Sequence, residues 1–250
     1  MGESHNIPAV LLAGGLGTRL RPLTDSIPKA LAPIGDTPLL GIWLSLLSKA
    51  GVGPMVVNLH HHADAVRTFL HEGGWHQNVT ASFEKELLGT GGTLLHHREM
   101  LQHGPFLAIH ADNFSMFDVK EFITAHHNRP AGTMITMMTF TTPTPSSCGI
   151  VELDARGVVV AFHEKKQNPP GDLANGAVYV MEPEILDTLD ECGAEFPDIS
   201  MDVIPRYLDK IYTYHNDCYH RDIGTMESYA QAQRDLVGLI EEGVLRQYME

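Results

Sequence analysis

Positively charged side chains are concentrated in one glycine-rich segment near the start of this chain, LLAGGLGTRLRPLTDSIPKALAPIG (residues 11–35). The protein has 17 lysines and arginines among 250 residues, and three of them lie between Arg19 and Lys29. Glycines let a backbone come close to a phosphate group, whose oxygens accept hydrogen bonds from free N–H groups. Arg19 offers a planar fork to phosphate oxygens, and the prolines stiffen the segment so that Lys29 can return to the same group. The segment therefore predicts a site for a phosphorylated ligand such as a triphosphate.

Two common phosphate-binding loops do not fit this segment. The dinucleotide fingerprint needs G-x-G-x-x-G, but from Gly15 the chain reads GLGTRL, which puts Leu20 in place of the third glycine. The Walker loop needs G-x-x-x-x-G-K-[ST]. From Gly14 the sixth residue is Arg19, and the chain contains no GK[ST]. A GGxG alone would favour an ordinary glycine turn with solvated cations, but the following RLRPLTDSIPK is much more specific and makes a phosphate loop of another kind the better interpretation.

Composition limits the classes of partner. The formal net charge of −14 disfavours binding to nucleic acid or to an anionic membrane. Three widely spaced cysteines, Cys148, Cys192 and Cys218, indicate free thiols and neither a disulfide framework nor a zinc site. The first ten residues, MGESHNIPAV, lack the pattern of a signal peptide. No apolar run approaches the roughly 18 residues of a membrane span, so we expect a soluble, cytoplasmic protein.

Apolar runs of strand length alternate with helical patterns through the first 140 residues. Strands are expected at 7–14, 54–59, 79–84, 105–112 and 133–140, and helices at 38–50, 63–72, 91–102 and 119–127. This alternation predicts a layered α/β fold with parallel strands and helices on both faces. After it come an expected hairpin at 148–164 with Gly157 in its turn, a strand at 175–181 and a helix from about 183.

The last part of the chain predicts further short elements. Ser200 is expected to cap a short helix, strands are expected at 210–215 and 218–224, and a final helix follows Thr225. The hairpin makes the sheet mixed. With no repeat or linker in view, we expect one domain over residues 1–250.

Seven motifs in order along the chain resemble those of the sugar-1-phosphate nucleotidyltransferases, the nucleoside-diphosphate-sugar pyrophosphorylases. The first is the signature loop LAGGLGTRLRPLTDSIPKALAPI (12–34). The others are FEKELLGTGGTL (83–94), AIHAD (108–112), CGIVELD (148–154), FHEKK (162–166), ANGAVYV (174–180) and HRDIGT (220–225). The resemblance implies a three-layer, Rossmann-like α/β fold with a mixed, mainly parallel central sheet. It also implies the reaction of a nucleoside triphosphate with a sugar 1-phosphate, which gives a nucleoside-diphosphate sugar and pyrophosphate.

The resemblance also implies a role for each matching residue. It places Arg19 on the leaving pyrophosphate, Lys29 on the α-phosphate and Lys165 on the phosphate of the sugar, as the catalytic groups. The nucleotide-binding residues would be Leu12, Ala13, Gly14, Gly15, Gly17, Thr18, Glu84, Gly89, Thr90 and Asp112. The sugar-binding residues would be Gly91, Glu164, Asn175 and Gly176. Asp112 and Asp222 would share Mg²⁺, which accepts a few carboxylates together with water and substrate phosphates.

The choice of substrates is less constrained. An ionised Glu84 only accepts hydrogen bonds, and guanine offers it two adjacent donors, N1–H and N2–H₂. We therefore expect GTP, with UTP or dTTP as alternatives, and a mannose- or D-glycero-D-manno-heptose-like 1-phosphate, with glucose or N-acetylmuramic acid as alternatives. A non-catalytic subunit that binds nucleotide sugars is the competing class, but the charged groups of the site are complete. The expected partners are small molecules, with no nucleic acid, no membrane and a homodimer as an open alternative, and no C-terminal β-helix domain is expected.

Overall fold

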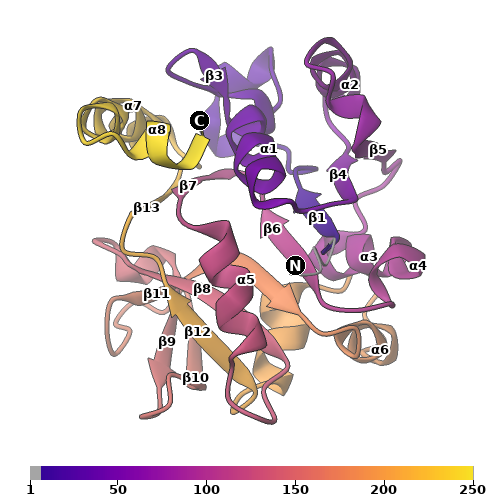
Figure 1. The fold of residues 1–250 in the computed structure, drawn as a ribbon, viewed down its shortest axis with the longest axis vertical. Helices are drawn as coiled ribbons and strands as arrows, with labels where there is room; N and C mark the ends of the chain where they lie inside the picture. The colour runs from indigo at the N-terminus through magenta and orange to yellow at the C-terminus, as the bar shows by residue number, and fades with distance from the viewer. Residues whose placement is uncertain (1–6, 250) are drawn as a thin grey trace, which may run out of the picture. The chain divides into compact units, whose positions relative to one another are not determined.

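The computed structural model describes residues 7–249 of the chain (Figure 1). These residues form two compact units. The first unit comprises the chain up to Leu87, Ile109–Val119 and the chain from Cys218 onwards, and the second comprises Leu88–Ala108 and Lys120–Asp217. The expectation of one domain over residues 1–250 stays a prediction. The N-terminal residues 1–6, on which the expected lack of a signal peptide partly depends, lie outside the described residues.

The first unit is built on parallel strands. β1 (Ala9–Leu12) pairs with β4 (Met55–Leu59), and β4 pairs with β5 (Val79–Phe83), each pair in parallel. The sheet order is β6-β1-β4-β5, and β6 (Phe106–His110) has residues in both units. β1 and β4 are buried along their whole length, as continuous apolar runs predict for parallel strands. Parallel strands direct their carboxyl ends to one edge, where the loop after β1 begins.

The helices of the first unit follow the sequence signals closely. α1 (Leu39–Ala50) was expected to begin with Pro38, but Pro38 is its N-cap and the helix starts one residue later. Gly51 follows the last turn in the left-handed conformation, as expected for the residue that ends the helix. α2 (Ala63–Glu72) matches its predicted range. A two-residue hairpin of β2 (Pro33–Ile34) and β3 (Thr37–Pro38) joins the signature loop to α1.

A short antiparallel ribbon completes the first unit, and one of its strands escaped prediction. β13 (Tyr219–Asp222) lies in the predicted range, but no element was predicted for its partner β7 (Asn113–Met116). The helix predicted after Thr225 is α7 (Met226–Glu241), and the Thr225 side chain caps it by accepting from the backbone N–H of Ser228. α8 (Val244–Met249) follows α7.

The second unit carries the antiparallel part of the sheet. Its strands are β8 (Ile135–Thr141), β9 (Gly149–Leu153), β10 (Val159–Glu164), β11 (Leu173–Met181) and β12 (Ile211–His215). β9 and β10 form the expected hairpin, with Gly157 at a φ of +76° in the turn. β8 pairs antiparallel with β11 and parallel with β12. The mixed α/β sheet is therefore confirmed.

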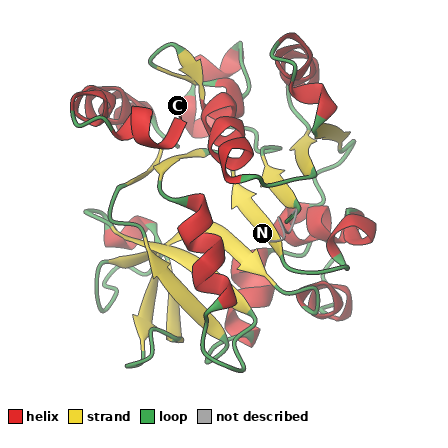
Figure 2. Ribbon diagram, in the orientation of Figure 1, coloured by secondary structure: helices red, strands yellow, loops and turns green. Residues whose placement is uncertain are grey.

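One helix packs on these strands. Figure 2 shows α5 (Val119–His127) lying across the strands, where the ring of Phe122 is 5.4 Å from that of Tyr214 on β12. The helix expected at 91–102 is divided into α3 (Gly89–His96) and α4 (Arg98–Leu101), and α6 (Ile185–Glu191) follows β11. None of the helices in the described part of the chain is long and apolar enough to cross a membrane.

The expected cap at Ser200 is wrong. Asp198 precedes the helical segment Ile199–Val203, and its carboxylate accepts from the backbone N–H groups of Ser200 and Met201. A carboxylate at this position satisfies two otherwise unpaired donors of the first turn. Ser200 thus contributes a backbone donor to the cap, and the capping side chain is Asp198.

Candidate active site

The lysine of the signature loop lies between the two carboxylates that the sequence assigns to a metal. Lys29 Nζ donates to Asp112 Oδ2 over 2.9 Å and to Asp222 Oδ1 over 3.1 Å. The Lys29 side chain is 8% exposed, whereas those of Asp112 and Asp222 are 43% and 55% exposed. Lys29, Asp112 and Asp222 all belong to the first unit, so residues nearly 200 positions apart along the chain form one charged group.

The β7–β13 ribbon brings the two carboxylates together. In its register Asp222 is opposite Asn113, the residue after Asp112, and Ser115 is opposite His220. Ser115 Oγ and His220 Nδ1 are 2.6 Å apart across the ribbon. Burial lowers the pKa of His220 to about 3, although the charge of Asp112 acts in the opposite direction. The imidazole of His220 is therefore neutral at neutral pH.

The charge balance favours ionised carboxylates. Partial removal from water would by itself raise the pKa of the Asp112 carboxyl, but the positive charge of Lys29, supported by His110 and by hydrogen bonds, keeps that pKa below its ordinary value. Oxygens of two carboxylates that converge on one cation form a donor set that suits Mg²⁺. No group of three potential metal ligands occurs among the described residues, so water and substrate phosphates would have to complete the shell of a magnesium ion.

Gly17 and Thr24 shape the loop that carries Arg19 and Lys29. Gly17 has a φ of +61°, and Thr24 Oγ1 donates to the Gly17 carbonyl over 2.8 Å. A Cβ on Gly17 would lie 2.9 Å from Thr24 Cγ2 and 3.3 Å from Lys29 Cβ. Glycine is therefore needed here for both the left-handed backbone and the contact with the Lys29 segment.

Arg19 lies close to the end of β13. A Cβ placed on Gly224 would lie 3.2 Å from Arg19 Nη2 and 2.9 Å from Asp222 Oδ2. The guanidinium of Arg19 and the carboxylate of Asp222 thus meet at the bare backbone of Gly224. This glycine, which the sequence did not single out, leaves room for both charged groups.

Asn58 is a polar residue of this region that sequence reasoning missed. It is the fourth residue of β4 and is 5% exposed. Its Oδ1 accepts from the backbone N–H groups of Ala13 and Gly14, over 2.6 and 3.0 Å. The signal in the sequence was an asparagine within the apolar run PMVVNL. These two N–H groups, predicted to face the nucleotide, therefore already have a partner.

Glu84, the predicted reader of the base, is also buried in this region. The residue is 4% exposed, and its Oε1 accepts from Asn58 Nδ2 over 3.1 Å. A contact with a nucleotide base would require Glu84 to move or to keep Asn58 as a shared partner. The base-reading role stays a prediction.

Gly89, Thr90 and Gly91 lie in the second unit and pack against the segment that contains Pro197. The Gly91 N–H donates to the Pro197 carbonyl over 2.8 Å, and Thr90 Oγ1 donates to Asp198 Oδ2 over 2.9 Å. A Cβ on Gly89 would lie 2.6 Å from the Pro197 oxygen. These glycines thus permit close backbone packing, and their contacts with substrate stay predictions.

Glu164, Asn175 and Gly176, with Lys165, lie at the ends or within strands of the second unit. Lys165 Nζ is 3.1 Å from Glu164 Oε1, and the Lys165 side chain is 68% exposed. The backbone of Lys165 has a φ of +46°. Asn175 donates to the Tyr179 hydroxyl over 2.7 Å. Burial, opposed in part by that hydrogen bond, raises the pKa of Tyr179, and the charges of Asp198 and Glu164 act in the same direction as burial. The predicted sugar-binding residues Glu164 and Asn175 therefore share Tyr179 as a neighbour.

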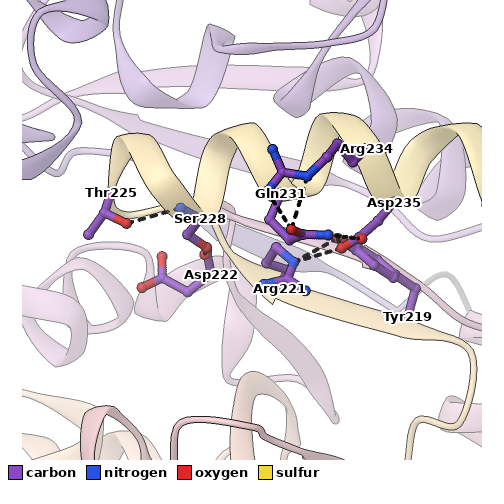
Figure 3. A network of polar contacts seen from close by, with 8 residues as sticks. All are labelled: Tyr219, Arg221, Asp222, Thr225, Ser228, Gln231, Arg234 and Asp235. Atoms are coloured by element: carbon purple, nitrogen blue, oxygen red, sulfur yellow. Dashed lines mark hydrogen bonds and ion pairs between the residues drawn. The ribbon is translucent and has the colours of Figure 1, made fainter.

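A polar network joins β13 to α7 in the first unit (Figure 3). Arg221 Nε and the Tyr219 hydroxyl both donate to Asp235 Oδ2, over 2.9 and 2.8 Å, and the Ser228 hydroxyl donates to the carbonyl of Asp222. The other side of α7 holds the end of the signature loop. The Tyr229 hydroxyl and Gln233 Nε2 each donate to the Pro33 carbonyl over 2.6 Å. α7 therefore contacts both segments that deliver the charged groups, one carrying Asp222 and the other following Lys29.

An α/β fold with a glycine-rich loop after its first strand, and with a lysine between two carboxylates, is an arrangement suited to phosphate chemistry. The chain belongs to the nucleotidyl transferase family, whose model matches residues 8–237. The resemblance of its motifs to the sugar-1-phosphate nucleotidyltransferases is thereby confirmed.

Similar proteins agree with this assignment. The chain is 31% identical to a mannose-1-phosphate guanylyltransferase of Mycobacterium tuberculosis, over 97% of this chain and 68% of the relative. It is 29% identical to a UTP–glucose-1-phosphate uridylyltransferase of Synechocystis, over 92% of this chain and 63% of the relative. Among these and a third relative, a probable mannose-1-phosphate guanylyltransferase of Oryza sativa, the chain spans 63–68% of the relative's length.

Solved structures show the same fold. A putative glucose-1-phosphate thymidylyltransferase from Bacillus anthracis has a TM-score of 0.83 at 19% identity, covering 91% of this chain and 94% of that protein. HddC from Yersinia pseudotuberculosis has a TM-score of 0.77 at 24% identity, covering 92% of this chain and 99% of that protein. The Rossmann-like fold that the motifs implied is confirmed.

Proposed function

We propose that this protein is a sugar-1-phosphate nucleotidyltransferase that condenses GTP with a mannose- or D-glycero-D-manno-heptose-like 1-phosphate. The observation that carries the proposal is the convergence of Lys29, Asp112 and Asp222, beside Arg19, in the first unit. The products are the nucleoside-diphosphate sugar and pyrophosphate. A non-catalytic nucleotide-sugar-binding protein would have no need of this complete set of charges.

The reaction makes one bond to phosphorus and breaks another. An oxygen of the sugar phosphate attacks the α-phosphorus of the nucleotide, and the bond from the α-phosphorus to the oxygen that bridges to the β-phosphate breaks. That oxygen leaves with the electron pair as part of pyrophosphate. Because the nucleophile is already an anion at neutral pH, no strong base is needed, and catalysis depends on positioning and on neutralising charge.

In this scheme the residues of the first unit have separate tasks. Lys29 balances the negative charge at the α-phosphate, and Arg19 binds the oxygens of the leaving pyrophosphate. Asp112 and Asp222 would hold Mg²⁺, which supplies charge neutralisation and orients phosphate oxygens when bound. Lys29 now pairs with both carboxylates, so it would exchange these partners for phosphate as the substrates and the metal bind.

Support for GTP comes from two sides. Glu84 is an acceptor that guanine could satisfy with two donors, and similar proteins from Mycobacterium tuberculosis and Oryza sativa are named as guanylyltransferases. The Synechocystis relative is named as a uridylyltransferase, so UTP with glucose 1-phosphate is the second candidate. On the sugar side we propose that Lys165 binds the phosphate and that Gly91, Glu164, Asn175 and Gly176 contact the sugar. We further propose a cytoplasmic setting and a role in supplying activated sugars to polysaccharide synthesis.

A product assay tests these substrate assignments. The protein would be incubated with Mg²⁺ and each pair of a nucleotide (GTP, UTP, dTTP, ATP or CTP) and a sugar 1-phosphate, with mass spectrometry of the products and a pyrophosphate assay. We expect the fastest turnover with GTP and a mannose-type 1-phosphate. A clear preference for UTP or dTTP would contradict the guanylyl assignment, and tight nucleotide-sugar binding without turnover of any pair would contradict catalysis itself.

A further inference from the structure

The side-chain amide of Asn58 connects the glycine loop to a buried carboxylate. Its Oδ1 accepts from Ala13 N and Gly14 N, and its Nδ2 donates to Glu84 Oε1. Two backbone donors on one side and a carboxylate acceptor on the other fix which end of the amide is oxygen and which is nitrogen. Asn58 therefore contacts the loop and Glu84 in one defined orientation.

The loop rests closely on this amide. A Cβ on Gly14 would lie 2.9 Å from Asn58 Nδ2 and 3.2 Å from Leu87 Cδ2, whereas a Cβ on Gly15 would meet nothing within 4 Å. Gly14 is thus a packing glycine on the Asn58 side of the loop, and Gly15 is the first glycine with open space beside it. The N–H groups of Ala13 and Gly14 are committed to Asn58, so backbone donors for a phosphate begin after them.

Glu84 is held in place to support Asn58. Its backbone N–H donates to the Leu59 carbonyl over 2.8 Å, and its carbonyl lies 2.9 Å from His60 Nδ1. Asn58 and Glu84 are 5% and 4% exposed. The hydrogen bond between this buried carboxylate and this buried amide restricts both groups, because breaking a hydrogen bond away from water costs more free energy than breaking one in water.

We propose that Asn58 is a positioning residue for the phosphate-binding loop, and that Glu84 orients Asn58. The pair turns the first two N–H groups of the loop inward and so determines which later backbone donors face the triphosphate. This rests on the proposed function only in taking a nucleotide as the ligand of the loop. A contact of Glu84 with the base is a separate question, because it would affect the choice of nucleotide and not the state of the Ala13 and Gly14 amides.

The test moves the negative charge of the pair from Glu84 to residue 58 in two steps, in the whole 250-residue chain. Asn58→Asp keeps oxygen acceptors for the loop but sets one carboxylate against another. Glu84→Gln keeps an acceptor for Asn58. The double variant N58D/E84Q restores the hydrogen bond in the reverse direction, because the side-chain amide at position 84 would then donate to the carboxylate at position 58. Asn78→Asp, at an exposed asparagine of the first unit, is the matched control.

The first readout is amide hydrogen exchange of Ala13 and Gly14, measured by NMR without ligand. We expect protection to fall by about tenfold or more in N58D, because repulsion from the Glu84 carboxylate would displace the new carboxylate from the N–H groups of Ala13 and Gly14. Protection should be kept in E84Q and in the control, and regained in the double variant. Unchanged protection in a folded N58D protein would overturn the proposal, and so would a double variant that is no better protected than N58D.

The second readout is steady-state kinetics with the best substrate pair. N58D should raise the KM for the nucleotide, with a smaller change in the KM for the sugar phosphate, and N58D/E84Q should recover most of that loss. Equal losses for both substrates without rescue would indicate general destabilisation and contradict a positioning role. If the wild-type protein turned over no pair, the proposed function would fail, and the exchange pattern would still decide whether Asn58 holds the loop.

Discussion

The ammonium of Lys29 lies 2.9 Å from Oδ2 of Asp112, so a cation expected on the α-phosphate is paired with a carboxylate expected on the metal. The same nitrogen also reaches Asp222. Without substrate and metal, the lysine and the two carboxylates neutralise each other's charge. This pairing lowers the free-energy cost of burying the Lys29 side chain, which is 8% exposed. Binding of substrate and metal then becomes an exchange of ionic partners.

Replacing Lys29 by Met should therefore have two opposite effects. We expect kcat to fall about 10²–10³-fold, the usual size of losing one charge that stabilises the transition state. Binding of Mn²⁺, used as a probe for Mg²⁺, should become tighter because Asp112 and Asp222 lose their competing cation. Calorimetry with Mn²⁺ and kinetics at saturating metal measure the two effects separately. Weaker Mn²⁺ binding in Lys29→Met would show that Lys29 supports the metal site and does not compete with it.

Two glycines of the loop should respond differently to alanine. Gly17 has a left-handed φ of +61° and would place its Cβ 2.9 Å from Thr24, so Gly17→Ala should lower the free energy of unfolding by about 1 kcal/mol or more. Gly15 has open space beside it, so Gly15→Ala should leave stability nearly unchanged but raise the KM for the nucleotide. Thermal unfolding and kinetics of both variants check this. A Gly15→Ala protein with normal nucleotide KM would contradict the phosphate-facing assignment of that residue.

Asp235 should influence the proposed metal site at Asp112 and Asp222 although it lies on α7. It holds Arg221 and Tyr219 of β13, the strand that ends at Asp222 (Figure 3). We expect Asp235→Asn to cost about 1 kcal/mol of stability, as for a partly exposed ion pair, and to raise the Mg²⁺ concentration for half-maximal activity several-fold. Arg234→Gln on the same helix, which is exposed and contacts Gln231, is the control. If the Mg²⁺ dependence of activity were unchanged in Asp235→Asn, α7 would not contribute to the positioning of Asp222.

His126 predicts how stability depends on pH. It is fully buried on α5 and lies 2.9 Å from Thr136 Oγ1, and burial, with the charges of Arg129 and His127, lowers its pKa from 6.5 to about 3. The unfolded chain binds a proton below pH 6.5 while the folded protein does not, so stability is lost as the pH falls from 6.5 towards 3. Between pH 7 and pH 5 the loss from this group amounts to about 2 kcal/mol.

Urea unfolding at several pH values tests this contribution. His126→Gln keeps a hydrogen-bonding side chain but cannot take up the proton, so its stability should vary less between pH 7 and pH 5 than that of the wild type. An identical pH dependence in the two proteins would mean that His126 is protonated in the folded state or that other groups dominate this range.

Periodicity and capping residues predicted most of the α/β elements, because each reflects local burial or local backbone geometry. α1 between Pro38 and Gly51, and α7 after Thr225, are clear cases. The four residues of β7 were missed because NFSM is too short to show a period, and its pairing with β13 joins segments about 100 residues apart.

The site shows the same limit. Sequence motifs identified Lys29, Asp112 and Asp222, but a lysine can pair with carboxylates or phosphates, and only the fold determines which partner lies nearby. Asn58 escaped notice because a single asparagine in a strand carries no pattern. Its importance arises from the two N–H groups of Ala13 and Gly14, which depend on how the loop leaves β1.

The most direct test of nucleotidyl transfer follows the α-phosphate itself. GTP labelled with ³²P at the α-position would be incubated with mannose 1-phosphate and Mg²⁺, using wild type and Lys29→Met, and the products would be separated. We predict that wild-type protein transfers the label into a nucleoside-diphosphate sugar and leaves the pyrophosphate unlabelled, with transfer at least about a hundredfold slower in Lys29→Met. Label that stays in GTP, or is released as GMP or GDP without a sugar product, or equal transfer by both proteins, would contradict this account.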